Sequence, residues 1–516
     1  MTTKTDREFD VIIVGSGAGG CAAAFVLVQA GLRVALVEKG QELPRDDCTL
    51  NIDAVVHQGC FKSHESWLDG RGRRFAPEEH FNIGGKTKWY GAALLRYAAA
   101  EFLPDPVHQC RGWPISAEDL APFYDIASQH LGIRFFECER DLGRIVNKLL
   151  ARSPRWRSEP MPLGLAAGIL NNRVEASHFD GFASPTGLKF DAETAFLSRV
   201  RHAPTLALFE GVAVIDLLPH ADGVTEIGGV RLADDRVLRA RSVLLAAGAL
   251  HSPRLLQRYI ERHRLRDATN YLHEVGRNLK LHLLTAMVAI SPSLKTDLIR
   301  KTRIFFNDEV PHSSVQPLGF DGELIATLIP RWVPKPVAKY IGRRSYGFFL
   351  QTEDGSHGDN RAITPGITDP AGADYPIMDY EEARLPAALH EHRRLISQFR
   401  AALLRAGMIA FSQRVGLAGT AHANGTLIAG DDPDTSVVDA EGKVHGLKSL
   451  YVVDGSVLPR SSRVNPSLTI FAWSLRTASL LAKQLGQTSA CAAPISWFGP
   501  CELSRYIDIN SRQGTE

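Results

Sequence analysis

The 516-residue chain contains little that would mark a metal, disulfide-linked or iron–sulfur protein. It has seven cysteines, and none of them form a C-x-x-C pair. Zinc and iron–sulfur sites usually need such spacing, so we expect no bound metal and reduced, mostly structural thiols. Cys491 and Cys501 are the pair that would join under oxidising conditions.

Long apolar runs and an excess of one charge are also missing. No run of about 18 apolar residues occurs, so no transmembrane helix is expected. The 59 basic and 57 acidic side chains leave a net charge of +2, which gives no indication of nucleic-acid or membrane-surface binding. The polar segment 1–10 leads directly into an apolar strand and leaves no room for a secretory signal, so a cytoplasmic location is expected.

What the chain does contain, directly after its N-terminus, is an apolar strand that ends in Gly-x-Gly-x-x-Gly. The strand is 11–14, and the glycines are Gly15, Gly17 and Gly20. A small-residue helix over 21–30 and a second strand ending at Glu38 follow. In this order the glycines permit a tight turn and close approach to a pyrophosphate, and the acid can bind a ribose hydroxyl. The alternative is a purely structural glycine-rich turn, and the motif by itself does not separate FAD from NAD.

The rest of the chain alternates helices and strands at both ends and is rich in strands in the middle. Segment 41–80 is polar and irregular. Helices are predicted over 116–130 (started by Ser116 and Asp119), 249–260, 386–407 and 466–485, and strands within 205–247, at 324–329, at 346–351 and at 449–454.

This order predicts an α/β protein, α+β overall. A Rossmann-like dinucleotide domain would be assembled from the discontinuous segments 8–150, 200–285 and 415–485. A substrate domain on a mostly antiparallel sheet, from 151–199 and 286–414, would be inserted into it. Residues 486–516 would form a C-terminal extension.

Several ordered motifs resemble the glucose–methanol–choline (GMC) family of FAD-dependent oxidoreductases. They span most of 8–485 and keep the order of the family. They are the Gly15–Gly20 fingerprint with Glu38, the Gly84-Gly85 loop, residues 245–253, a looser match from Asp369-Pro370 to Tyr380, His422-Ala-Asn-Gly-Thr426, and residues 450–456 followed by 465–470.

The resemblance implies FAD as the cofactor and assigns residues to it. These are Gly15, Ser16, Gly17, Ala18, Gly20, Glu38 and Lys39 for the ADP half; Val214 at the adenine; Gly84, Gly85, Thr87, Gly91 and Ala92 beside the pyrophosphate and the flavin ring; Ala247 and Gly248 in the motif at 245–253; Asp454 and Gly455 at the ribityl part; and Asn465, Pro466 and Thr469 at the pyrimidine edge. Related sugar oxidases tether FAD through a histidine in the loop after the double glycine. Trp89 stands there in this chain, so non-covalent FAD is expected, and Trp89 and Tyr90 would either stack near the ligand or pack in the core.

The resemblance also implies the catalytic pair His422 and Asn465. An alcohol is a poor hydride donor until its hydroxyl proton is removed, and imidazole titrates close to working pH. His422 would accept the proton while hydride passes to flavin N5, and Asn465 would orient the hydroxyl. The plain alternatives are a structural histidine among the eighteen in the chain and an asparagine that only caps a helix.

The expected substrate is a small-molecule alcohol, most closely a hydroxyl of a sugar, a glycoside or an aminoglycoside precursor such as paromamine. Glu353 and Asp354 are candidate carboxylates for a cationic substrate, and Lys86, Lys88 and Arg96 are interpreted as a solvated basic face. The electron acceptor, O₂ or another molecule, and the oligomeric state leave no readable motif. A non-sugar alcohol substrate, a flavin-containing lyase of the same fold and a flavin-stabilised scaffold remain as alternatives.

Overall fold

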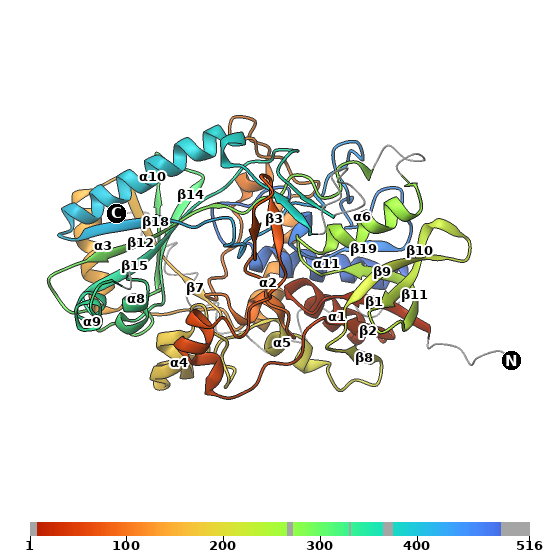
Figure 1. Ribbon diagram of the computed structural model, residues 1–516, viewed down its shortest axis with the longest axis horizontal. Coiled ribbons are helices and arrows are strands. Elements are labelled where there is room, and N and C mark those ends of the chain that lie inside the picture. Colours follow the sequence, from red (N-terminus) through yellow and green to blue (C-terminus); the bar gives the residue numbers. More distant parts are fainter. Residues whose placement is uncertain (1–7, 266–271, 330–331, 365–374, 487–516) are drawn as a thin grey trace, which may run out of the picture.

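Two sheets lie side by side in the computed structural model, which describes residues 8–265, 272–329, 332–364 and 375–486 (Figure 1). One is a mixed seven-stranded sheet and the other an antiparallel six-stranded sheet. The predicted segments Asp369-Pro370, Cys491, Cys501 and 487–516 lie outside the described residues. The α/β class and the Rossmann-like arrangement are confirmed. No helix in the described ranges is long and apolar enough to cross a bilayer.

The mixed sheet has a parallel core with an antiparallel hairpin at one side. Its order is β8 (Leu206–Phe209), β2 (Val34–Val37), β1 (Glu8–Val14), β11 (Val237–Leu245), β10 (Gly223–Leu232) and β9 (Val214–His220), with β19 (Leu450–Val452) also paired to β11. β8, β2, β1, β11 and β19 run parallel, whereas β10 pairs antiparallel with both β11 and β9. Strands from three distant parts of the chain therefore end at one edge of this sheet.

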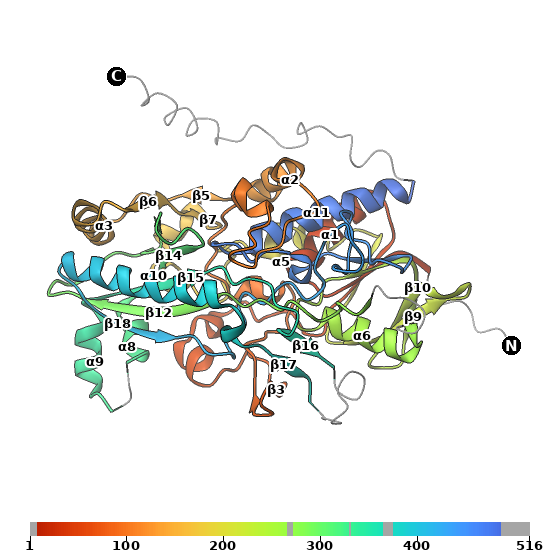
Figure 2. The same cartoon turned by 90° about the horizontal axis from the view of Figure 1, so that it is seen from above.

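The first and last helices of the described chain pack against each other beside this sheet (Figure 2). They are α1 (Ala18–Gln29) and α11 (Ser467–Gln484). A Cβ atom on Gly20 would lie 1.8 Å from the Gly15 carbonyl oxygen, and one on Gly19 would lie 1.9 Å from that of Val453. Ser474 of α11 donates a hydrogen bond of 2.6 Å to the Gly19 carbonyl. Small residues are thus required where α1 meets the sheet and α11.

The second sheet is antiparallel throughout, as the sequence predicted. Its order is β18 (Ile409–Arg414), β12 (Leu283–Ile290), β15 (Ser345–Thr352), β14 (Ser313–Pro317), β13 (Arg303–Asn307) and β6 (Trp156–Pro160). The long helix α10 (Pro386–Arg405) lies along one side of it, and α8 (Gly322–Thr327) and α9 (Lys335–Gly342) lie on the other (Figure 2).

The remaining α-helices and strands surround these two sheets. They are α2 (Ala117–His130), α3 (Arg140–Arg152), α4 (Arg173–His178), α5 (Ala192–Ala195), α6 (Ser252–Arg262), the four-stranded sheet of β16 (Arg361–Ile363), β17 (Ile377–Asp379), β3 (Trp67–Asp69) and β4 (Arg74–Phe75), and the pair β5 (Arg134–Phe135) and β7 (Pro162–Leu163).

Most of the predicted elements are confirmed, and one is wrong. Ser116 and Asp119 form a capping box at the start of α2, and α10 has a proline in its first turn, as expected. Residues 324–329 were expected as a strand, but 322–327 form helix α8, because the Asp321 carboxylate accepts the Leu324 amide hydrogen bond and caps a helical turn.

The division into two domains stays a prediction. The strands of the mixed sheet fall within the ranges expected for the dinucleotide domain, and those of the antiparallel sheet fall largely within the others. The boundary expected between 285 and 286 lies inside β12, so the division would have to precede Leu283.

Candidate functional site

A cavity of about 580 Å³ opens at the carboxyl ends of the parallel strands. β1, β2 and β11 all end in its wall, and the segment after β19 contributes Asp454 and Gly455. Gln316 of β14 and Phe349 of β15 close it from the antiparallel sheet. The cavity therefore lies where the two sheets meet, with the dinucleotide motifs on one side and the second sheet on the other.

All but three of the residues expected at the site line this cavity. They are Gly15, Ser16, Gly17, Ala18, Glu38, Lys39, Gly85, Thr87, Gly91, Ala92, Val214, Ala247, Gly248, His422, Asp454, Gly455, Asn465 and Pro466. The exceptions are Gly20, Gly84 and Thr469. Gly20 is packed against Gly15, Gly84 donates its amide hydrogen to Ser16 Oγ at 3.3 Å, and the buried Thr469 hydroxyl pairs with Tyr124 at 2.8 Å.

Two helix N-termini point at the cavity without a side-chain cap. α1 begins after Gly17 and α11 after Pro466, and neither has an acidic residue in its first turn. The first backbone N–H groups of a helix lack partners within the helix and carry a partial positive charge. Both ends are therefore suited to hold a negatively charged group of a ligand.

Glu38 and Asp454 tie the cavity loops to the strand ends. Glu38 accepts hydrogen bonds from the Ser16 amide at 2.8 Å and from the Ser16 hydroxyl at 2.7 Å. Asp454 accepts them from the Gly248 amide at 2.9 Å and the Ser252 hydroxyl at 2.5 Å. Burial raises the pKa of both carboxyl groups, and these hydrogen bonds oppose the rise. Each acid thus fixes a loop in the wall of the cavity.

The cavity fits the ADP part of a dinucleotide. A Cβ on Gly17 would meet no protein atom within 4 Å, so the backbone there is open to a ligand, and Gly85 approaches so closely that its Cβ would lie 3.0 Å from Gly17 Cα. Among the described residues, His251 Nε2 and Arg254 Nε line the same cavity as buried atoms with no hydrogen-bond partner. Glu65 Oε2 lies 3.8 Å from His251 Nε2, beyond hydrogen-bond distance, so a polar group of a bound ligand could still satisfy these buried atoms.

His422 and Asn465, which are distant in sequence, are neighbours in the cavity wall. The amide nitrogen Nδ2 of Asn465 lies 3.3 Å from His422 Nε2. The Asn465 carbonyl oxygen Oδ1 accepts a hydrogen bond from Gln316 Nε2. Asn465 stands directly before the start of α11, and Pro466 fixes its approach to the helix.

Burial lowers the pKa of His422 well below its usual range, and the neighbouring His282 and the Lys301 ammonium act in the same direction. A neutral imidazole in this position has one nitrogen free to accept a proton. The geometry and the charge state both suit a general base.

Two residues beside this pair were missed by the sequence analysis. His282 Nδ1 lies 3.1 Å from His422 Nδ1, and Gln316 contacts Asn465. Neither stands in a motif that we had singled out, and both come from the antiparallel sheet or the turn that leads into it. Only their contacts with His422 and Asn465, which are far away in the sequence, identify them.

Charged side chains also line the cavity beside the pair. Lys301 and Asp180 form an ion pair of 2.9 Å, and a Cβ on Gly91 would lie 2.2 Å from Asp180 Oδ1 and 2.3 Å from Lys301 Nζ. Lys86 pairs with Glu79. Gly91 therefore gives room to an ion pair that the sequence did not indicate.

Three expectations about charged residues are corrected. Glu353 and Asp354 do not line the cavity: they are fully buried behind it and bind Arg460 and Ser461. Lys88 was expected on a solvated face, but it is buried between Asp191 at 3.0 Å and Glu193 at 2.6 Å. Each side chain is satisfied by a partner far away in sequence.

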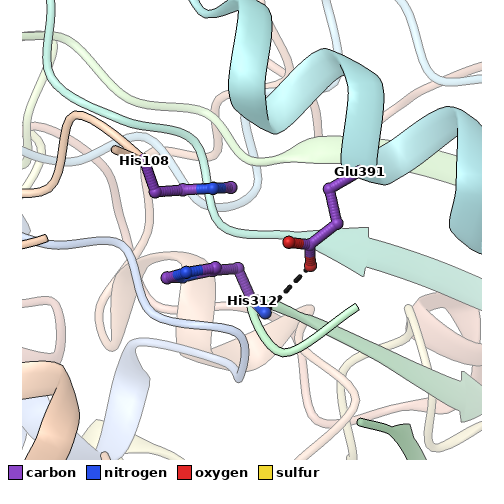
Figure 3. A group of neighbouring side chains, drawn as sticks. All are labelled: His108, His312 and Glu391. Carbon is purple, nitrogen blue, oxygen red and sulfur yellow. Dashed lines mark hydrogen bonds between the residues drawn. The ribbon is translucent and has the colours of Figure 1, made fainter. Parts of the chain in front are cut away.

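His108, His312 and Glu391 form a group close enough to hold a metal ion (Figure 3). The two rings stack at 3.8 Å, but both His312 nitrogens and His108 Nε2 already have protein partners. His312 lies 3.1 Å from Glu353 and 3.1 Å from Asp105, and His108 lies 2.8 Å from the Glu353 carbonyl. Burial alone would lower the pKa of His312, but Glu353 outweighs it and the pKa is raised. The expected absence of a metal stays a prediction.

Known proteins resemble this chain along nearly its whole length. A family model described as FAD dependent oxidoreductase matches residues 10–272, and one described as GMC oxidoreductase matches 374–474. The 6'''-hydroxyparomomycin C oxidase of Streptomyces lividus and the paromamine 6'-oxidase of Streptomyces fradiae are each 29% identical, over 94% of this chain and 93% of theirs. A formate oxidase structure from Aspergillus oryzae superimposes with a TM-score of 0.65 at 16% identity, covering 93% of this chain and 99% of that one, and shows the likeness of the folds.

Alanine substitutions at Gly17 and Gly20 should have different effects, the first on FAD binding and the second on folding. Gly17→Ala has a compatible backbone angle (φ −71°) and meets no protein atom, so the apoprotein should keep its melting temperature while its affinity for FAD falls. The matched change Gly20→Ala should destabilise the apoprotein itself, because its Cβ overlaps the Gly15 carbonyl. Thermal denaturation and fluorescence titration with FAD measure the two effects. Unchanged FAD affinity in the Gly17 variant would contradict the assignment of this loop.

Proposed function

This chain belongs to the FAD-dependent oxidoreductases of the GMC type, and we propose that it oxidises a hydroxyl group of an aminoglycoside or a related sugar. Its cofactor is FAD, and it acts on a CH–OH group. The observation that supports the proposed site is the pair of His422 Nε2 and Asn465 Nδ2, 3.3 Å apart in the wall of the dinucleotide cavity.

The residues have separate roles in this reaction. The His422 imidazole accepts the hydroxyl proton at Nε2, and the Asn465 amide donates a hydrogen bond to the same hydroxyl oxygen and orients the alcohol. FAD held by the Gly15–Gly20 turn, Glu38 and Asp454 would supply the hydride acceptor, so the alcohol would lose one proton to His422 and one hydride and become an aldehyde or a ketone. The N-terminus of α11 adds a partial positive charge beside the reacting groups.

Two observations support an amino-sugar substrate. The two curated relatives reported above are named as oxidases of paromamine and of a hydroxyparomomycin. Glu78, Glu79 and Asp180 line the cavity that also holds His422. Each carboxylate is paired with a lysine, namely Lys62, Lys86 and Lys301, so the ammonium groups of a substrate would bind there by replacing lysine in these ion pairs. Non-covalent attachment of FAD, and O₂ or another molecule as the electron acceptor, are further parts of the proposal.

Anaerobic titration of the purified flavoprotein tests the reaction and the substrate together. Paromamine should bleach the flavin absorbance band, neutral sugars should do so less, and simple alcohols least, because only the amino sugar offers cations to the cavity carboxylates. Readmitting air then separates an oxidase from a dehydrogenase. A band that no alcohol bleaches would favour the lyase or scaffold alternatives.

Replacing the proposed base should stop the chemistry and spare the cofactor. His422→Ala should still bind FAD but reduce it about 10²–10⁴-fold more slowly, the usual contribution of a general base. His390→Ala, an exposed histidine of α10, is the matched control and should reduce flavin at the wild-type rate. Stopped-flow absorbance under anaerobic conditions gives both rate constants. Wild-type reduction in the His422 variant would exclude it as the base.

The lowered pKa of His422 predicts the pH dependence. Because burial disfavours the imidazolium, the base stays neutral as the pH falls through about 6.5, where a free histidine takes up a proton. The limiting rate constant of flavin reduction should therefore be flat across that pH and fall only at lower values. The wild-type enzyme is measured with saturating substrate at each pH. A loss of rate centred near pH 6.5 that disappears in the His422 variant would contradict this.

A further inference from the structure

We propose that His282 is a positioning residue that fixes the tautomer of His422 and so directs its basic nitrogen, Nε2, toward the substrate. This inference rests on the proposed function, because it concerns the same base. The evidence is a chain of hydrogen bonds that runs through both histidines. The partners at its two ends allow only one placement of the ring protons.

The first end is a backbone carbonyl. His282 Nε2 lies 2.8 Å from the Ser462 carbonyl oxygen, which only accepts hydrogen bonds, so His282 carries its proton on Nε2. Nδ1 of the neutral ring is then a bare acceptor. It lies 3.1 Å from His422 Nδ1, which must therefore donate, so the lone pair of the His422 ring is on Nε2.

The second end leads to the same result. Gln316 Nε2 donates to Asn465 Oδ1, which leaves the Asn465 NH₂ group facing His422 Nε2 at 3.3 Å. An amide NH₂ only donates, so His422 Nε2 must be an acceptor and its proton must be on Nδ1. The two ends, Ser462 and Gln316, belong to different parts of the chain and agree.

The backbone is strained at His282 and at its partner Ser462. His282 and Ser462 both have left-handed conformations, with φ of +63° and +67°. Such residues persist where the surroundings over-determine them, and they cluster at functional sites. The His282 side chain is buried and meets His422 edge to face, at a centroid distance of 4.9 Å and an angle of 79°.

Buried carboxylates hold these two strained segments in place. Asp354 accepts the Leu281 amide at 2.7 Å, next to His282, and the Ser461 hydroxyl at 2.7 Å, next to Ser462. Glu353 accepts the Ser462 amide at 3.1 Å. The two segments that hold the His282 hydrogen bond are thus fixed by the same pair of acids.

This arrangement also suits the charged state that follows proton transfer. When the hydroxyl O–H bond breaks and an Nε2–H bond forms, His422 becomes an imidazolium whose Nδ1–H still points at the bare His282 Nδ1. No second proton has to move, so His282 accepts the same hydrogen bond before and after the step, and that bond is stronger when the donor is charged.

Two variants of His282 of similar length test the proposal. His282→Gln keeps a carbonyl acceptor for His422 and an NH₂ donor for Ser462, whereas His282→Met offers neither. Both variants replace histidine at the same left-handed position, so the backbone strain is similar in the two. We expect the limiting rate of flavin reduction to fall roughly 10²-fold or more in the Met variant and to stay within about tenfold of wild type in the Gln variant. Equal rates in the two variants, at either level, would overturn the proposal.

The ¹⁵N spectrum of histidine-labelled holoenzyme gives a readout independent of turnover. The His422 signals, assigned by their loss in His422→Ala, should show a protonated Nδ1 and a bare Nε2 in wild type and His282→Gln, and a different or averaged pattern in His282→Met. Protonated Nε2 in the wild-type enzyme would refute the inference even if His282→Met fails to fold. Absence of alcohol-dependent flavin reduction with the expected spectrum would instead refute the proposed function alone.

Discussion

The buried pairing of Glu353 and Arg460 is the interaction on which the proposed reacting centre depends. The Arg460 guanidinium donates to both Glu353 oxygens, at 2.9 and 2.6 Å, and both side chains are almost fully buried. Removing one partner of such a pair leaves an uncompensated charge and typically costs about 3–5 kcal/mol. Together with Asp354, this pair anchors the chain just before Asn465 and the turn that carries His282. The proposed base is thus positioned by acids that never face the substrate.

The two sheets contribute different kinds of residue to the cavity wall. The parallel sheet contributes strand ends, glycine turns and helix N-termini, which suit an anionic dinucleotide. The antiparallel sheet contributes Gln316 and Phe349, which face the part of the cavity where a substrate would lie. His422 and Asn465 stand where the two walls meet. The dinucleotide motifs therefore lie on one sheet, and the second sheet closes the cavity opposite them.

The sequence predicted what short-range chemistry determines. The Gly15–Gly20 turn, the Ser116 cap and the proline start of α10 each depend on residues within a few positions, and all three are present. The 324–329 segment was assigned wrongly because a short apolar run suits a strand or a buried helix equally. His282, Gln316 and the true place of Glu353 could not be predicted, since each is defined by a partner more than a hundred residues away.

The packing of α1 on α11 bears on the order in which this protein matures. The first turn of the dinucleotide site is held by Ser474 and by the Val453 backbone, both close to the end of the described chain. A chain emerging from the ribosome makes its first glycine turn several hundred residues before the helix that supports it. The cofactor site is therefore completed only after synthesis of α11, so the ordering of the glycine turn has to wait for this helix, and a product truncated before it would lack the support of that turn.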